Sequence, residues 1–491
     1  MLQLLEHVDT VRKRVGQQIN PKRKSELGQF MTPLPVARFM ASLFQPSTLQ
    51  PMRLLDAGAG IGSLTGAFLD HVAAGGSPSG RVEVTAYEID AKLRNILSQN
   101  LAEYQGKSDL GVSVHSSDFI EEAVKMVLAG ERPFTHAILN PPYKKISSAS
   151  RHRALLREAG IETVNLYSAF VSLAVKLMQP GGQIVAIIPR SFCNGPYYRP
   201  FRDIIFERTA IRHMHLFDSR NSAFKDDDVL QENIIIALEC DGGQGRVTVS
   251  TSTDDSFSDT GINVHPFDRI VFPGDQEHFI HIPTTPDREL SEASTSINQS
   301  LAEIGVQVST GPVVDFRLKE YLRQIPEADT VPLLYPLHFS GKALDWPKMN
   351  AKKPNAIVRN CETEKWLFPS GDYVVVRRFS SKEEKRRVVA NFISSADFKT
   401  PVLGFENHLN VLHFGKKGLP ENLARGLAVY LNSTEVDAQF RRFSGHTQVN
   451  ATDLKSLKYP PREVLTNLGI WAKAQGVITQ EIIDKKIESF T

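Results

Sequence analysis

Hydrophobic and polar positions alternate along the first half of the chain in two patterns that follow one another. Short runs rich in β-branched residues predict strands, and segments with apolar residues three or four positions apart predict helices. The predicted strands cover residues 53–58, 81–89, 112–118, 136–140 and 181–189. The predicted helices cover residues 62–74, 90–104, 121–129, 163–178 and 199–211. This order predicts a Rossmann-like, doubly wound α/β sheet with helices on both faces.

Two further apolar runs, residues 211–218 and 233–239, have no helical pattern between them. We expect them to form an antiparallel hairpin at one edge, which would make the sheet mixed. Residues 241–262 are rich in Gly, Ser, Thr and Asp, as expected of a domain boundary with room for one strand. Beyond this boundary the pattern predicts an α+β domain, with strands at 371–381 and 409–418 and one or two helices within 420–443.

The length of the chain supports the same division. With 491 residues, the chain exceeds the size at which one hydrophobic core keeps growing, so two domains are expected. We predict a basic N-terminal arm (1–25), an α/β domain (26–245), a linker region (246–300) and an α+β domain (301–491).

The composition is that of an ordinary globular protein, with 41% hydrophobic and 23% charged residues. No apolar run approaches the roughly 20 residues that a membrane helix needs, and the first residues lack the apolar core of a secretory signal. Three cysteines, Cys193, Cys240 and Cys361, lie far apart and predict neither disulfides nor a zinc site. We therefore expect a protein without metal or membrane association, located in the cytoplasm.

A glycine-rich turn follows the first predicted strand. Asp56 ends that strand, and Gly58, Gly60 and Gly62 precede the helix. Glycines let the backbone approach a ligand closely, and ligands of open α/β sheets bind outside the carboxyl ends of the strands. The third glycine comes one residue too early for the dinucleotide fingerprint, so a nicotinamide cofactor is not the first choice.

Acidic residues end the next two strands. Glu88 could accept hydrogen bonds from both hydroxyls of a ribose, and Asp118 precedes Phe119, which could pack on a purine. Polar strand ends are common, but three successive acids beside a glycine turn suit a ligand with a nucleoside and a positive charge. S-adenosylmethionine fits this description. Its predicted contacts are Asp56, Gly58, Gly60, Glu88, Ile89, Asp118, Phe119 and Asn140.

The fourth predicted strand ends in the tetrapeptide Asn140, Pro141, Pro142 and Tyr143. The exocyclic amine of adenine is a poor nucleophile because its lone pair is delocalised into the ring. An enzyme that methylates it must hold the nitrogen in a more tetrahedral geometry. The side-chain oxygen of Asn140 and the main-chain oxygen of Pro141 could serve as two acceptors in a loop stiffened by the prolines, while Tyr143 stacks on the base.

The tetrapeptide, the DAGAGIG turn and the segment LGQFMTP (27–33) together resemble the amino-methyltransferases of bacterial restriction-modification systems, in the order of their gamma group. The resemblance covers residues 20–240 motif by motif. It implies an S-adenosylmethionine-dependent methyltransferase of class I fold that modifies N6 of a flipped-out adenine in double-stranded DNA, followed by a target-recognition domain.

The resemblance also implies roles for individual residues. Phe30, Thr32 and Pro33 would close over the methionine part of the cofactor. A looser match over residues 221–239 implies that Phe224 stacks on the base opposite Tyr143. The second half shows no paired-acid and lysine nuclease pattern, so the implied partner is a separate restriction endonuclease. An enzyme that modifies one strand per visit can act as a monomer. The resemblance also implies a location in the bacterial cytoplasm, at the nucleoid.

Basic residues are distributed unevenly, although the net charge is only +2. They gather in the N-terminal arm and again late in the chain, where amides, histidines and aromatics accompany them. Such side chains can contact base edges and phosphates, although ordinary polar loops have the same composition. The predicted DNA contacts are Arg377, Arg378, Arg442, His446, Gln448 and Asn450.

Three alternatives remain open. Similar tetrapeptides occur in cytosine-N4 methyltransferases and in enzymes that methylate glutamine side chains of release factors. Asparagine at position 140 favours adenine over cytosine, and the large C-terminal half favours DNA over protein. A non-catalytic DNA-binding subunit is the third alternative, and the complete set of Asp56, Glu88, Asn140 and Tyr143 argues against it.

Overall fold

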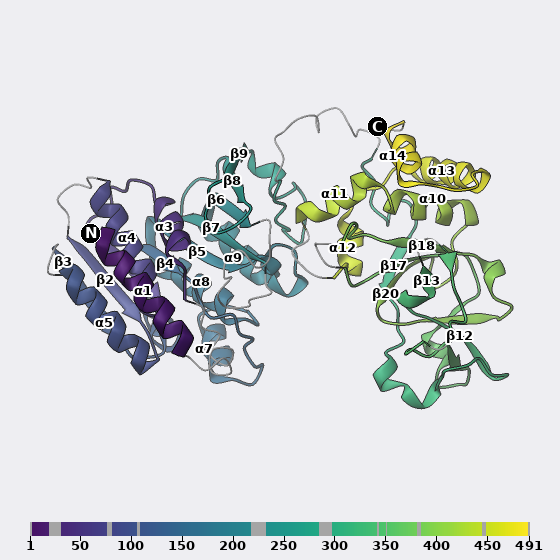
Figure 1. Cartoon of the computed structure of the whole chain (residues 1–491), viewed down its shortest axis with the longest axis horizontal. Helices are drawn as coiled ribbons and strands as arrows, with labels where there is room; N and C mark the ends of the chain where they lie inside the picture. Colours follow the sequence, from purple (N-terminus) through teal and green to yellow (C-terminus); the bar gives the residue numbers. More distant parts are fainter. Residues whose placement is uncertain are drawn as a thin grey trace. The chain divides into compact units, whose positions relative to one another are not determined.

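The computed structural model describes the backbone of most of the chain (Figure 1). The described residues are 2–18, 31–75, 81–105, 109–217, 232–283, 297–340, 343–349, 351–380, 384–443 and 448–489. They form two compact units, Met1–Pro286 and Asp287–Thr491. Within the described part, no helix is both long and apolar enough to cross a lipid bilayer.

The first unit is built on one nine-stranded sheet with the order β3-β2-β1-β4-β5-β7-β6-β8-β9. Strands β1 to β5 are mutually parallel, whereas β7 runs antiparallel to both β5 and β6. This confirms the predicted mixed, doubly wound sheet. The strands are β1 (Met52–Ala57), β2 (Val82–Tyr87), β3 (Leu110–His115), β4 (Phe134–Leu139), β5 (Met178–Pro189), β6 (Thr209–Phe217), β7 (Asn233–Cys240), β8 (Val247–Ser252) and β9 (Gly261–His265).

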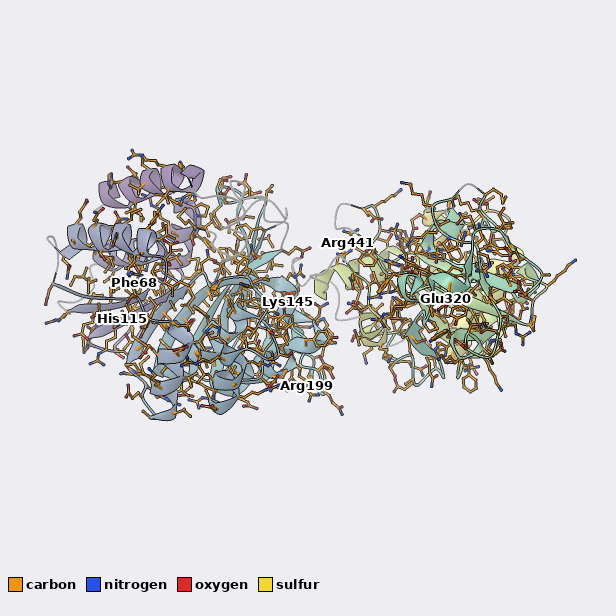
Figure 2. The ribbon with its side chains drawn as sticks, turned by 90° about the horizontal axis from the view of Figure 1, so that it is seen from below. Phe68, His115, Lys145, Arg199, Glu320 and Arg441 are labelled. Carbon is orange, nitrogen blue, oxygen red and sulfur yellow. The ribbon has the colours of Figure 1, made fainter. Side chains whose placement is uncertain are left out.

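Helices cover both faces of this sheet because apolar side chains alternate along its strands. Leu54, Ile138 and Val185 are buried on one face, and their sequence neighbours Leu55 and Ala137 are buried on the other. The first face is covered by α1 (Leu2–Gln18), α3 (Leu34–Ser42), α4 (Ser63–Ala74) and α5 (Ala91–Gln105), and the second by α6 (Phe119–Leu128), α7 (Arg151–Glu158), α8 (Leu166–Leu177) and α9 (Arg199–Arg208). Phe68, labelled in Figure 2, is fully buried between α4 and the sheet.

The predicted N-terminal arm is wrong for residues 2–18, which form the packed helix α1. Leu5 and Val8 are buried, and α1 lies beside α4 (Figure 1). Arg12 is buried as well, with its Nε donating to Asp9 at 2.7 Å. The apolar spacing of this helix outweighs its basic residues, so residues 2–18 are part of the domain. Residues 19–25 lie outside the described residues.

The predicted linker is also wrong in its first part. Strand β8 pairs with β6, and β9 pairs with β8, so residues 247–265 extend the sheet past the predicted hairpin edge. Val247 and Val249 are buried and Thr248 between them is partly exposed, which is the alternation of a half-buried strand. The surrounding Gly, Ser, Thr and Asp residues concealed this alternation in the sequence.

The second unit combines two main sheets with a group of helices. An antiparallel sheet has the order β10-β20-β17-β18, and a mixed sheet has the order β11-β15-β12-β19-β16. The strands are β10 (Gln307–Thr310), β11 (Leu322–Arg323), β12 (Thr330–Leu334), β13 (Phe339–Ser340), β14 (Ala343–Leu344), β15 (Ala356–Val358), β16 (Leu367–Pro369), β17 (Tyr373–Arg377), β18 (Ala390–Ile393), β19 (Val402–Phe405) and β20 (Leu409–His413). The helices are α10 (Glu421–Leu431), α11 (Thr434–Phe443), α12 (Ala451–Ser456), α13 (Arg462–Ala474) and α14 (Gln480–Glu488).

Strand β17 separates two of the three hydrophobic clusters found in the described part of this unit. Val374 and Val376 pack toward the helices, whereas Tyr373 and Val375 pack toward the mixed sheet. Helices α10 and α13 approach each other unusually closely. A Cβ at Gly426 would lie 1.8 Å from the carbonyl oxygen of Leu465, and a Cβ at Gly469 would lie 1.7 Å from that of Asn422. Backbone therefore touches backbone at this crossing.

We expect Gly426→Ala to force α10 and α13 apart and to lower the free energy of unfolding of the second unit by about 3 kcal/mol, the upper range for overpacking a core. Denaturant unfolding measures this directly. Gly476→Ala is the matched control, because a Cβ there would meet no atom within 4 Å. Equal stability of the two variants would contradict the close helix packing.

Candidate active site

Two backbone hydrogen bonds tie the glycine turn after β1 to the end of β2. The amides of Gly58 and Ala59 donate to the carbonyl of Tyr87 at 2.9 and 3.0 Å, which joins the ends of β1 and β2. Gly58 and Gly60 have φ angles of 80° and 58°, a region that side-chain-bearing residues rarely adopt. A Cβ at Gly60 would meet no atom within 4 Å, so the turn presents bare backbone to open space.

A cavity lies over this turn at the carboxyl ends of the parallel strands. The predicted residues that line it are Thr32, Gly58, Gly60, Glu88, Ile89, Asp118, Phe119, Asn140 and Pro142. These residues come from segments more than a hundred positions apart in sequence. The structure therefore brings the segment at residue 32, the glycine turn, the acidic strand ends and the tetrapeptide together around one cavity.

Asp56 is not among the residues that line the cavity, contrary to the predicted cofactor contact. It is fully buried beneath the turn, where one carboxylate oxygen accepts a 2.6 Å hydrogen bond from the hydroxyl of Thr65. The other oxygen has no hydrogen-bond partner among the described residues. Burial raises the pKa of Asp56 to about 7. Asp56 thus links β1 to α4 under the cavity floor.

Glu88 is buried at the cavity wall, and backbone amides fix its carboxylate. One oxygen accepts from Gly60 at 2.9 Å, and the other accepts from Asp90 at 2.7 Å. Burial raises the pKa of this carboxyl group. Each carboxylate oxygen can accept more than one hydrogen bond, so these contacts leave Glu88 able to receive further donors.

Asp118 begins a helix as well as following a strand. One of its oxygens caps α6 by accepting from the amides of Ile120 and Glu121 at 2.8 and 3.2 Å. The other lies 3.0 Å from Nε2 of His152 on α7. Phe119, beside it, packs against Tyr87 and Phe170 in the wall of the cavity, with ring centroids 5.2 and 5.0 Å apart.

Asn140 connects two predicted motifs. Its side-chain nitrogen donates to the hydroxyl of Thr32 at 3.0 Å, and its side-chain oxygen accepts from the hydroxyl of Tyr143 at 3.3 Å. The same tyrosine hydroxyl lies 3.2 Å from the carbonyl of Ile187 on β5. The amide is therefore held at both ends, with its oxygen directed along the tetrapeptide.

The rest of the tetrapeptide has two different environments. Pro141 is buried, and its carbonyl oxygen accepts no hydrogen bond from the described residues. Tyr143 does not line the cavity; its ring is half-buried and meets Tyr167 edge-on at 6.3 Å. Burial raises the pKa of Tyr143, so its hydroxyl remains a donor. A main-chain acceptor thus stays available beside the fixed amide.

Other predicted residues lie elsewhere. Pro33 is buried at the start of α3, where its carbonyl accepts from Ala37 at 2.9 Å, and it does not line the cavity. Phe30, Phe224 and His446 lie outside the described residues. The cavity wall also includes residues that the sequence did not single out: Met31, Ala59, Ile61, Ser63, Leu64, Tyr87, Leu93, Ser117, Ile120, Lys144, His152, Leu166 and Phe170. Of these, eight directly adjoin predicted residues in the sequence, which was an available signal: Met31, Ala59, Ile61, Ser63, Tyr87, Ser117, Ile120 and Lys144.

Four of the predicted DNA contacts have partners within the described part of the second unit, namely Arg377, Arg378, Gln448 and Asn450. Arg377 pairs with Glu384, and Arg378 donates to the carbonyl of Asn407 at 2.8 Å and to the side-chain oxygen of Gln448 at 3.1 Å. The backbone N–H of Asn450 donates to the side-chain carboxylate of Asp453 at 2.7 Å, at the start of α12. Arg442 lies in α11. Arg378 and Gln448 thus contact each other, and their hydrogen bonds stabilise the second unit.

Comparison with known proteins gives consistent results for sequence and fold. Residues 81–224 match the family described as Eco57I restriction-modification methylase. The chain is 53% identical to the type II methyltransferase M.BsuBI of Bacillus subtilis over 99% of this chain and 98% of the relative. It is 43% identical to the type II methyltransferase M.PstI of Providencia stuartii over 94% of this chain and 92% of the relative.

Two solved structures share the fold. The DrdV-DNA complex aligns with a TM-score of 0.53 and 13% identity, over 95% of this chain and 59% of that chain. The type IIL restriction-modification enzyme MmeI, in complex with DNA, aligns with a TM-score of 0.52 and 10% identity, over 99% of this chain and 73% of that chain.

The buried carboxyl group of Asp56 predicts a pH-dependent stability of the first unit. Its pKa of about 7 lies above the ordinary value of 3.8, so the folded state holds the proton more tightly than the unfolded chain. The free energy of unfolding should therefore fall by a few kcal/mol from about pH 4 to about pH 7 and level off above that range.

Asp56→Asn should reduce this slope, because the amide carries no titrating proton and can still accept from Thr65, whereas Glu88, whose pKa is also raised, still titrates. Unfolding measured across the same pH range, in the absence of cofactor, tests the prediction. Asp109→Asn changes an exposed residue of the same unit and should leave the wild-type slope. An unchanged slope in Asp56→Asn would contradict the assignment.

Proposed function

The chain belongs to the type II DNA methyltransferases of restriction-modification systems, and from this premise we propose that it transfers a methyl group from S-adenosylmethionine to N6 of an adenine flipped out of duplex DNA. The observation that carries the proposal is the position of Asn140. Its fixed amide lines the cavity over the glycine turn, next to the carbonyl of Pro141, which accepts no hydrogen bond from the described residues. We further propose that the methylation protects host DNA from a separate restriction endonuclease.

The cavity has the chemistry that S-adenosylmethionine needs. The carboxylates of Glu88 and Asp118 suit ribose hydroxyls and the amine of an adenine ring, and Ile89 and Phe119 supply apolar surface for that ring. The bare backbone over Gly60 leaves space for the ligand to approach closely. When bound, the cofactor supplies a methyl group activated by the sulfonium charge.

The chain's own residues would orient and polarise the target amine. Asn140 Oδ1 and the carbonyl oxygen of Pro141 would accept its two hydrogens, which favours a tetrahedral nitrogen with its lone pair free for attack. Oδ1 has two lone pairs, so it can accept from the substrate while Tyr143 still donates to it. Because Thr32 and Tyr143 already fix the amide, little reorganisation is needed at the moment of reaction.

A flipped base must also be held outside the helix. Extrusion costs a few kcal/mol, and stacking on aromatic side chains recovers roughly 1 to 3 kcal/mol per base. We assign this stacking to Tyr143 and Phe224. The half-buried ring of Tyr143 would offer one face to the base while its hydroxyl stays on Asn140. The enzyme would need no partner subunit for this step and could act as a monomer.

We expect the purified protein to transfer label from radioactive S-adenosylmethionine to plasmid DNA, and nucleoside digestion to recover the label in N6-methyladenine. Asparagine at position 140 is the reason to expect adenine. Recovery in N4-methylcytosine would establish the competing amino-methyltransferase activity instead. Absence of label from DNA under conditions where the cofactor binds would overturn the proposal as a whole.

Asn140→Ala should lower the rate of methyl transfer on the order of 100-fold or more, as expected for the loss of a pre-positioned hydrogen-bonding group. Cofactor affinity, measured by calorimetry, should change far less, because Glu88 and the glycine turn remain. Asn95→Ala on the exposed surface of α5 is the matched control and should behave as wild type. A loss of cofactor affinity as large as the loss of rate would show that Asn140 acts on the cofactor and not on the amine.

A further inference from the structure

A buried carboxylate in the second unit orients an exposed imidazole. Glu406, 0% exposed, lies in the turn between β19 and β20, and His408 lies two residues further on with 40% of its side chain exposed. Glu406 Oε2 accepts from the His408 amide at 2.9 Å, and Oε1 lies 2.5 Å from His408 Nδ1. One buried side chain thus fixes both the backbone and the ring of His408.

The turn itself is braced from two sides. The amide of Asn407 donates to the carbonyl of Val313 at 2.9 Å. Arg378 donates through its guanidinium to the carbonyl of Asn407 at 2.8 Å and through its amide to the carbonyl of His408 at 2.9 Å. These bonds hold residues 406–408 in place, which keeps the imidazole in one orientation before any ligand arrives.

The imidazole has an aromatic neighbour on the surface. Phe379 is 43% exposed, and its ring centroid lies 5.1 Å from that of His408, with the planes tilted by 38°. Because Nδ1 faces the carboxylate, it carries the proton in the neutral ring, and Nε2 is left as an acceptor. Nε2 makes no hydrogen bond with any of the described residues. The two rings therefore present one directional acceptor beside one apolar face.

Stability alone does not account for this arrangement. Burying a carboxylate costs free energy, and a buried ionic group contributes little net stability compared with apolar residues of the same size. Here the buried charge is used to orient a ring whose other side faces solvent, beside an exposed phenylalanine. Such a costly, rigid support is typical of a side chain that must meet a ligand in a fixed direction.

We propose that His408 and Phe379 form a base-reading contact with the major groove of the target DNA. The inference rests on the proposed function, since it takes duplex DNA as the substrate. In the major groove an acceptor can bind the exocyclic amine of adenine or cytosine, and an apolar face can contact the methyl group of thymine. The A·T pair offers both, so it is the pair that His408 and Phe379 would read. Glu406 is the positioning residue.

The test begins with the wild-type protein, whose methylated sites in plasmid DNA define the recognised sequence. Duplexes carrying that sequence and each of its single-base-pair substitutions are then methylated by wild type, His408→Ala and Phe379→Ala under single-turnover conditions. Discrimination is the ratio of the rate on the recognised duplex to the rate on a substituted one. In both variants this ratio should fall about tenfold at one and the same A·T pair and stay unchanged at the other positions, as expected for the loss of one base contact.

Phe414→Ala is the matched control for the aromatic substitution. Phe414 is exposed but follows the far end of β20, roughly 20 Å from His408 at about 3.3 Å per residue. The Phe414→Ala variant should discriminate between the duplexes as the wild-type protein does. Glu406→Gln should weaken discrimination at the same pair as His408→Ala, and thermal unfolding of each variant separates this effect from misfolding.

Two outcomes would overturn the base-reading role while leaving the methyltransferase activity intact. One is wild-type discrimination at every position in both His408→Ala and Phe379→Ala. The other is an equal loss of rate on all duplexes, which indicates a phosphate contact or a structural role. Failure of the wild-type protein to methylate any DNA would instead remove the proposed function itself.

Discussion

The parallel alignment of β1, β2, β3 and β4 is the constraint on which the candidate active site depends. Parallel strands end at the same edge, so residues that follow each strand meet there even though they are distant in sequence. The glycine turn, Glu88, Asp118 and Asn140 occupy four such positions. Apolar residues alternate along these strands, so helices pack on both faces of the sheet. The same packing fixes the positions of the strand ends, and therefore of the residues around the cavity.

The sequence predicted this edge well because its signals are local. Strand-end acids, a glycine turn and an Asn-Pro-Pro-Tyr tetrapeptide can each be read within a few residues. The contacts that modify their roles are not local. Thr65 holds Asp56 beneath the floor, His152 meets Asp118 from another helix, and Ile187 lies beside the Tyr143 hydroxyl across a strand pair. Only the folded chain reveals which strand-end acid faces the cavity.

The second unit was predictable only as a mixture of strands and helices. Its strands span two to five residues, too short for a period to emerge from the sequence, and its sheets pair segments far apart in the chain. Arg378 and Gln448 have the side chains of DNA contacts, but they bond to each other and to a turn. Composition does not distinguish a side chain that meets a ligand from one that supports its neighbour. His408 stands out only through its buried carboxylate partner.

The crossing of α10 and α13 limits how this unit can be recombined with those of its relatives. Gly426 and Gly469 lie on separate helices, yet each must be small because of the other helix's backbone. A chimera with its junction between them would inherit one glycine from each parent. If the two helices lay further apart in either parent, the hybrid would combine two helices whose surfaces do not fit each other. Exchanges of this unit between such enzymes should therefore take both helices from a single source.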